Sequence, residues 1–111
     1  MNSAIPSKTY KLRLPDDISP HAIYFTIVGH SDPMWMFVNS KSMDSFQWVT
    51  ALMTSYSRQI KADVPIREII NQMKETFSPN GRYVIPDGSG REVPSLIHHL
   101  GLVLEEHCAT L

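Results

Sequence analysis

The sequence predicts an α+β fold, in which a two- or three-stranded antiparallel sheet built on a hairpin over residues 22–39 is packed on one face by three helices. Three observations lead to this prediction. Segments rich in β-branched and aromatic residues gather in the first 40 positions. Three later segments repeat apolar residues at helical spacing, and turn residues separate the segments. A sheet followed by helices is typical of α+β domains rather than of βαβ folds.

Residues 22–28 and 34–39 are the clearest strands, and a five-residue loop with a Gly and a Pro separates them. Pairing Val28 with Met34 divides the side chains between two faces. The first face then carries Ile23, Phe25, Ile27, Trp35 and Phe37, and the second carries Ala22, Tyr24, Thr26, Val28, Met34, Met36 and Val38. Residues 10–14 alternate apolar and basic side chains, which predicts an edge strand.

Both faces of the predicted hairpin are apolar, whereas a small antiparallel sheet normally keeps one face in water. The three helices follow consecutively and can cover only one face, so either the N-terminal arm or another copy must cover the second. We favour self-association, and therefore expect a homo-oligomer. Its expected interface residues are Tyr24, Met34, Met36 and Val38.

Each predicted helix has an apolar stripe at 3.6-residue spacing. The first helix carries Phe46, Val49, Leu52, Met53, Tyr56 and Ile60; the second carries Ile66, Ile69, Ile70, Met73 and Phe77; the third carries Leu96, Ile97, Leu100, Val103 and Leu104. Pro65 and Pro94 stand where the second and third helices begin, and proline is well tolerated in a first turn. A short extended piece is expected over residues 82–85.

The size and composition of the chain limit the classes of protein to which it can belong. Its 111 residues suffice for one core, so we expect residues 1–9 to form a flexible arm and residues 10–111 a single domain. A net charge of −1 predicts no membrane partner and no long nucleic acid. The single cysteine excludes an internal disulfide. Without a signal-peptide-like segment or a long apolar run, a cytoplasmic location is expected.

Five local strings resemble one known module. They are I-Y-F-T-I at 23–27, F-V-N-S-K-S-M-D-S-F-Q-W at 37–48, V-P-I-R-E-I-I at 64–70, F-S-P-N-G at 77–81 and V-P-S-L-I at 93–97. The chain resembles, over residues 10–107, the C-terminal accessory domain of vitamin B12-dependent (class II) ribonucleotide reductases, a domain of the TSCPD type. The resemblance implies the fold of that domain in a stand-alone version.

The chain departs from this family in ways that limit its chemistry. The Thr-Ser-Cys-Pro-Asp string and a terminal cysteine pair are absent, and Cys108 stands alone. The catalytic barrel, radical cysteine and cobalamin site of the reductase lie outside the accessory domain. The resemblance therefore implies a binding module rather than an enzyme, and we expect no cofactor.

The strand-to-helix corner at Ser40, Lys41 and Ser42 is a candidate anion site, because free N–H groups and the helix dipole favour negative charge there. Arg82 or Arg91 from the Gly-rich loop could close over it. The alternative is an ordinary capped helix with a solvated lysine. His98, His99, Glu105, His107 and Cys108 are candidate metal ligands, but the histidines lack the i, i+3 or i, i+4 spacing of ligands on one helix. We therefore expect the adjacent His98 and His99 to be surface groups on the polar flank of the helix, and we expect no metal.

The sequence thus favours a non-catalytic module that binds a nucleotide-like ligand or a protein partner. One version is a small phage or mobile-element protein that sequesters a nucleotide signal. The alternatives are a structural oligomerisation protein and a small hydrolase. No G-x-S-x-G motif supports a serine nucleophile.

Overall fold

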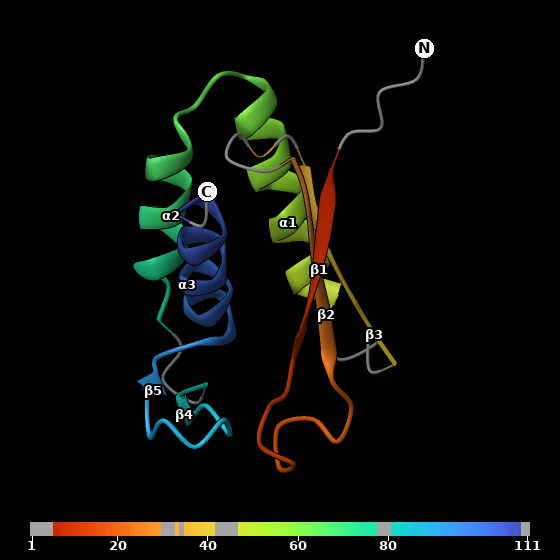
Figure 1. The fold of residues 1–111 in the computed structure, drawn as a ribbon. Helices are drawn as coiled ribbons and strands as arrows, with labels where there is room; N and C mark the ends of the chain where they lie inside the picture. The colour runs from red at the N-terminus through yellow and green to blue at the C-terminus, as the bar shows by residue number, and fades with distance from the viewer. Residues whose placement is uncertain (1–5, 30–32, 34, 42–46, 78–80, 110–111) are drawn as a thin grey trace.

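The computed structural model describes residues 6–29, 33, 35–41, 47–77 and 81–109. In chain order its elements are β1 (Ser7–Leu12), β2 (Ile23–Val28), β3 (Trp35–Ser40), α1 (Gln47–Lys61), α2 (Ile66–Lys74), β4 (Tyr83–Val84), β5 (Glu92–Val93) and α3 (Leu96–Ala109). The first three strands form an antiparallel sheet in the order β1-β2-β3, and β4 and β5 form a small hairpin. All three helices lie on one side of the larger sheet (Figure 1). The predicted α+β fold is confirmed.

The edge strand β1 begins earlier than expected. It starts at Ser7 and pairs all six of its residues with β2, so residues 7–9 belong to the sheet and not to a flexible arm. Two contacts favour this extension. The Thr9 and Thr26 hydroxyl groups are hydrogen-bonded at 2.8 Å, and the Gly29 N–H donates to the Pro6 carbonyl at 2.7 Å.

The register of the hairpin corrects the predicted faces. Val28 pairs with Trp35 and not with Met34, which lies outside the described residues. A shift of one residue moves every side chain of a strand to the opposite face. The helix-covered face carries Ile23, Phe25, Ile27, Met36 and Val38, none more than 7% exposed, while the open face carries Tyr24, Thr26, Val28, Trp35, Phe37 and Asn39. The observed register stacks the most apolar side chains under the helices.

Helix α1 also covers the outer edge of β3. The Met36 N–H donates to the buried Ser57 hydroxyl, which donates in turn to the Met36 carbonyl, both at 3.1 Å. Unpaired backbone groups on an edge strand otherwise invite pairing with another chain. The open edge of the larger sheet is therefore β1.

The helix boundaries follow local capping chemistry. Asp63, with φ of 67°, ends α1 in a Schellman arrangement, in which Val64 N–H donates to Gln59 O at 3.0 Å. Pro65 is the N-cap of α2 rather than part of its first turn. Because α2 ends at Lys74, Phe77 falls outside the helix and is 71% exposed; its predicted place in the core is wrong.

The first and third predicted helices are confirmed over the described residues. Phe46 lies outside those residues, but Val49, Met53 and Tyr56 are buried as expected. The N-cap of α3 is Ser95, whose hydroxyl accepts the His98 N–H at 3.0 Å. The extended piece predicted over residues 82–85 is confirmed at β4, while its partner β5 was not anticipated.

Helices α2 and α3 approach closely at Gly101. A Cβ atom at this position would lie 2.9 Å from Met73 Cβ, closer than side chains tolerate. The absence of a side chain therefore sets the spacing of the two helices. Their shared interior is fully buried and comprises Ile69, Ile70, Met73, Ile97, Leu100 and Leu104.

Candidate functional site: a basic pocket at one end of the sheet

A pocket of about 200 Å³ lies at the end of the sheet where β1 ends, β2 begins and β3 ends. These three positions meet because the strands are antiparallel and adjacent. Figure 1 shows this end at the bottom, next to the loop that joins β1 to β2. The lining residues are Lys11, Arg13, Pro20, His21, Ala22, Tyr24 and Lys41.

The pocket lining is basic. Two lysines, an arginine and an imidazole line it, and none of its lining residues is acidic. The ion pairs formed among described residues are Arg67–Glu105, Lys74–Glu105 and Arg82–Glu92, none of which involves this pocket. Within that part of the chain, no carboxylate neutralises Lys11, Arg13 or Lys41 at ion-pair distance. Clustered uncompensated cations raise the local concentration of anions.

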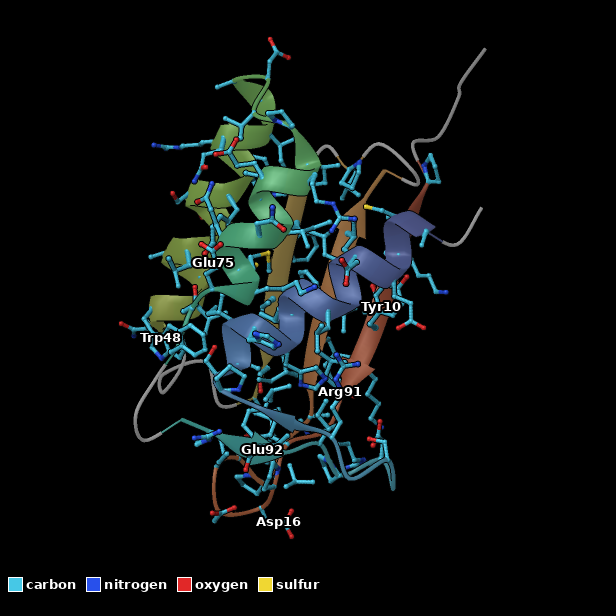
Figure 2. The ribbon with its side chains drawn as sticks, turned by 90° about the vertical axis from the view of Figure 1, so that its left-hand side faces the viewer. Tyr10, Asp16, Trp48, Glu75, Arg91 and Glu92 are labelled. Atoms are coloured by element: carbon cyan, nitrogen blue, oxygen red, sulfur yellow. The ribbon has the colours of Figure 1, made fainter. Side chains whose placement is uncertain are left out.

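Two further hollows adjoin the basic pocket and share its residues. One of about 220 Å³ is lined by the β1–β2 loop and includes Arg13, His21 and Asp16. The other, of about 270 Å³, includes Lys11, Arg13, Asp87 and His99. Asp16 lies at the lower end of the molecule in Figure 2, on the outside of the loop. Lys11 and Arg13 are therefore accessible from more than one side.

Hydrogen bonds fix the walls of the basic pocket. The Ser40 hydroxyl donates to the Ala22 carbonyl at 3.1 Å and ties the end of β3 to the start of β2. The buried Ser19 hydroxyl lies 3.0 Å from the His21 carbonyl and 3.2 Å from the His21 backbone nitrogen, as donor and acceptor respectively. Ser40, which directly precedes Lys41 in the chain and was predicted as part of an anion site, thus forms a hydrogen bond to the Ala22 backbone.

The other residues of the predicted anion site separate into two groups. Lys41 lines the basic pocket, and Ser42 lies outside the described residues. Arg82 forms an ion pair with Glu92 at 2.9 Å. Neither Arg82 nor Arg91 lines the pocket that contains Lys41. The predicted closure of these arginines over the strand-to-helix corner is therefore not seen.

The predicted interface residues also separate. Tyr24 is 42% exposed on the open face and lines the basic pocket. Met36 and Val38 are buried beneath the helices, so their predicted place on a surface is wrong. The cause is the register, which exposes Phe37 instead. Met34 lies outside the described residues.

Lys11, Arg13 and His21 were not recognised as site residues from the sequence. The signal was present, because basic residues alternate along the predicted edge strand and His21 directly precedes a strand. Linking them to Lys41 requires the strand order, which brings three separate segments to one end of the sheet.

His99 is buried against Tyr83 and lines the hollow next to the basic pocket. The Tyr83 hydroxyl lies 2.7 Å from His99 Nδ1. Burial lowers the pKa of His99 from 6.5 to about 4, although the nearby Asp87 carboxylate partly opposes this shift. Burial also raises the pKa of Tyr83. A neutral imidazole that accepts the Tyr83 O–H at Nδ1 carries its proton on Nε2.

His107 forms a second tyrosine–histidine pair, in which the histidine is buried and Tyr10 is half-buried. Its Nδ1 lies 2.7 Å from the Tyr10 hydroxyl, and its Nε2 donates to the Gly29 carbonyl at 2.9 Å. These contacts tie the end of α3 to β1 and to the residue after β2. The expectation that His99 is a surface group is wrong, since it is 5% exposed, and His107 is also buried, at 2% exposed. The described residues contain no group of three or more His, Cys, Asp or Glu arranged to hold a metal ion.

The structure is a small α+β module with a pocket lined by basic side chains at one end of its sheet. A family model for the TSCPD domain matches residues 6–108, nearly the whole chain, and the chain therefore belongs to the TSCPD domain family. This membership agrees with the resemblance to the accessory module of ribonucleotide reductase. No curated protein and no solved structure matches the chain. Among the described residues, no helix has the length and apolar character needed to cross a membrane.

Proposed function

We propose that this TSCPD domain is a non-catalytic binding module that holds the phosphate group of a nucleotide-like ligand in the basic pocket. The observation that carries the proposal is the convergence of Lys11 and Arg13, at the end of β1, with Lys41, after β3, without a described carboxylate at ion-pair distance. Assembling like charges in one place is unfavourable unless an anion completes the site.

The chemistry of the lining suits a phosphate monoester. A guanidinium group donates two parallel hydrogen bonds to a phosphate, and each lysine adds a mobile positive charge. The described pocket is smaller than the roughly 300–1,000 Å³ typical of whole-ligand sites. It therefore suits the charged end of a ligand, while the remainder extends along the adjoining surface.

Tyr24 provides the surface on which a ring would extend. It lines the pocket and leaves 42% of its area exposed. Stacking of a base on an exposed aromatic ring contributes about 1–3 kcal/mol. A ligand with both a phosphate and a planar ring would engage the cations and Tyr24 together, which favours a nucleotide over a simple anion.

A thermal-shift screen tests this proposal. The expected result is stabilisation by nucleoside monophosphates and diphosphates but not by nucleosides, reaching about 2.7 kcal/mol at 100 times the dissociation constant. Arg13→Ala should abolish the shift. Arg58→Ala is the matched control, because Arg58 lies in the last turn of α1, at the opposite end of the sheet from the pocket (Figure 1). Equal shifts in both variants, or no shift with any nucleotide, would contradict the proposal.

A further inference from the structure

The open face of the sheet has an unusual composition. The register places Ser7, Thr9, Lys11, Tyr24, Thr26, Val28, Trp35, Phe37 and Asn39 on it. No aspartate or glutamate occurs anywhere in β1, β2 or β3. The helices all lie on the other side of the sheet (Figure 1). The face thus offers aromatic rings, hydroxyl groups and the ammonium group of Lys11, but no strand residue of negative charge.

Three aromatic rings follow one another along this face. Tyr24 pairs with Asn39, Phe37 with Thr26, and Trp35 with Val28. Along the strands, counted from the basic pocket, successive rings are therefore two residues apart. Diagonal neighbours on adjacent strands are about 7–8 Å apart. Tyr24 and Phe37 are 42% and 45% exposed, and Tyr24 also lines the basic pocket. The row of rings therefore begins at the proposed phosphate site.

Positive charge is present at both ends of the row. Lys11, Arg13 and Lys41 lie at the pocket end. At the other end, Lys61 Nζ lies 4.7 Å from the centroid of the Trp35 ring. A polyanion that enters the pocket and follows the rings would meet a cation at each end of its path.

We propose that this face binds a short single-stranded oligonucleotide, whose bases stack on Tyr24 and Phe37 while one phosphate occupies the basic pocket and another meets Lys61 over Trp35. The inference rests on the proposed phosphate site and extends it to a ligand class. Single strands bind to proteins by this combination of aromatic stacking and cationic backbone contacts. Ribose and deoxyribose strands share the chemistry, and comparison of the two sugars distinguishes them.

Charge favours an oligonucleotide over a second copy of the chain on this face. Two copies packed face to face would bury Lys11 and the cations of the adjoining pocket against strands that offer no carboxylate to pair with them. Opposed like charges are destabilising in sheets and at interfaces. A nucleic acid strand supplies the negative charges that this surface lacks and bases that can stack on its exposed rings.

The test compares 5′-phosphorylated trinucleotides of adenosine and deoxyadenosine with adenosine monophosphate by isothermal titration. The trinucleotide is expected to bind at least about tenfold more tightly than the mononucleotide, because a further base stacks on Phe37 and a further phosphate meets Lys61. Phe37→Ser should reduce trinucleotide affinity by about tenfold and leave mononucleotide affinity unchanged. Phe77→Ser is the matched control, since Phe77 is 71% exposed and lies outside the sheet.

The outcomes separate the two proposals. Equal affinities for mononucleotide and trinucleotide, or equal effects of the two serine variants, would overturn the oligonucleotide site while leaving the phosphate pocket in place. Trinucleotide binding that depends on Phe37 but not on Arg13 would overturn the pocket and support the face. A dimer in sedimentation that Phe37→Ser dissociates, without any effect on oligonucleotide binding, would assign the face to a second copy and overturn the inference.

Discussion

Burial of His99 makes the stability of the domain depend on pH. The imidazole is 5% exposed and its pKa is lowered to about 4, below the value of 6.5 for an unperturbed histidine. The unfolded chain therefore binds a proton more readily than the folded one. The free energy of unfolding should be unaffected by His99 above about pH 7 and should fall as pH decreases from about 6.5 toward 4.

The size of this effect follows from the two pKa values. One pKa unit corresponds to about 1.4 kcal/mol, so His99 accounts for a loss of about 3 kcal/mol by pH 4 and about 2 kcal/mol by pH 5. This is a large share of the roughly 5–15 kcal/mol that stabilises a typical domain. The loss should therefore be measurable by urea denaturation.

Urea unfolding at pH 7, 6 and 5 should be compared between the wild type and His99→Asn. The asparagine carboxamide can accept the Tyr83 O–H as Nδ1 does, but it does not titrate. The variant should lose about 2 kcal/mol less than the wild type between pH 7 and pH 5. Tyr83→Phe should lower stability at every pH and retain the wild-type slope. Parallel curves for wild type and His99→Asn would refute the account of this buried pair.

Four further substitutions test the packing and the helix cap at Asp63, each by urea denaturation. Gly101→Ala should destabilise the domain by about 1 kcal/mol, because overpacking against Met73 outweighs the helix-propensity gain; a more stable variant would show that the helices separate easily. Asp63→Gly should add about 0.5–1 kcal/mol by relieving the left-handed backbone conformation, and a loss of stability would contradict the helix cap. Phe25→Ala should cost about 3–5 kcal/mol and Phe37→Ala less than about 1 kcal/mol, whereas the reverse order would refute the register.

The sequence predicted the elements better than their pairing. The helices and the hairpin strands followed from local periodicity, which depends only on which residues face the core. The register did not, because β3 is apolar on both sides: Trp35 and Phe37 alternate with Met36 and Val38. An alternation with a period of two is therefore compatible with either set of side chains facing the helices. What decides it is tertiary, including the bonds between the Met36 backbone and Ser57.

Only the part of the candidate site that depends on neighbouring residues in the sequence was predicted. Lys41 was identified from its strand-to-helix corner, whereas its association with Lys11, Arg13 and His21 depends on the order of three strands. His99 was assigned to a polar helix flank, because sequence spacing cannot reveal that β4 supplies a tyrosine to cover it. In both cases the missing information was the contact between segments distant in sequence.

The most direct test of the phosphate site is a titration of ¹⁵N-labelled protein with adenosine monophosphate, followed by amide chemical shifts. The account predicts that the largest changes occur at Lys11, Arg13, His21 and Lys41, and that adenosine without phosphate produces no such changes. Changes concentrated elsewhere, or identical changes with adenosine, would contradict the claim that this pocket holds a phosphate.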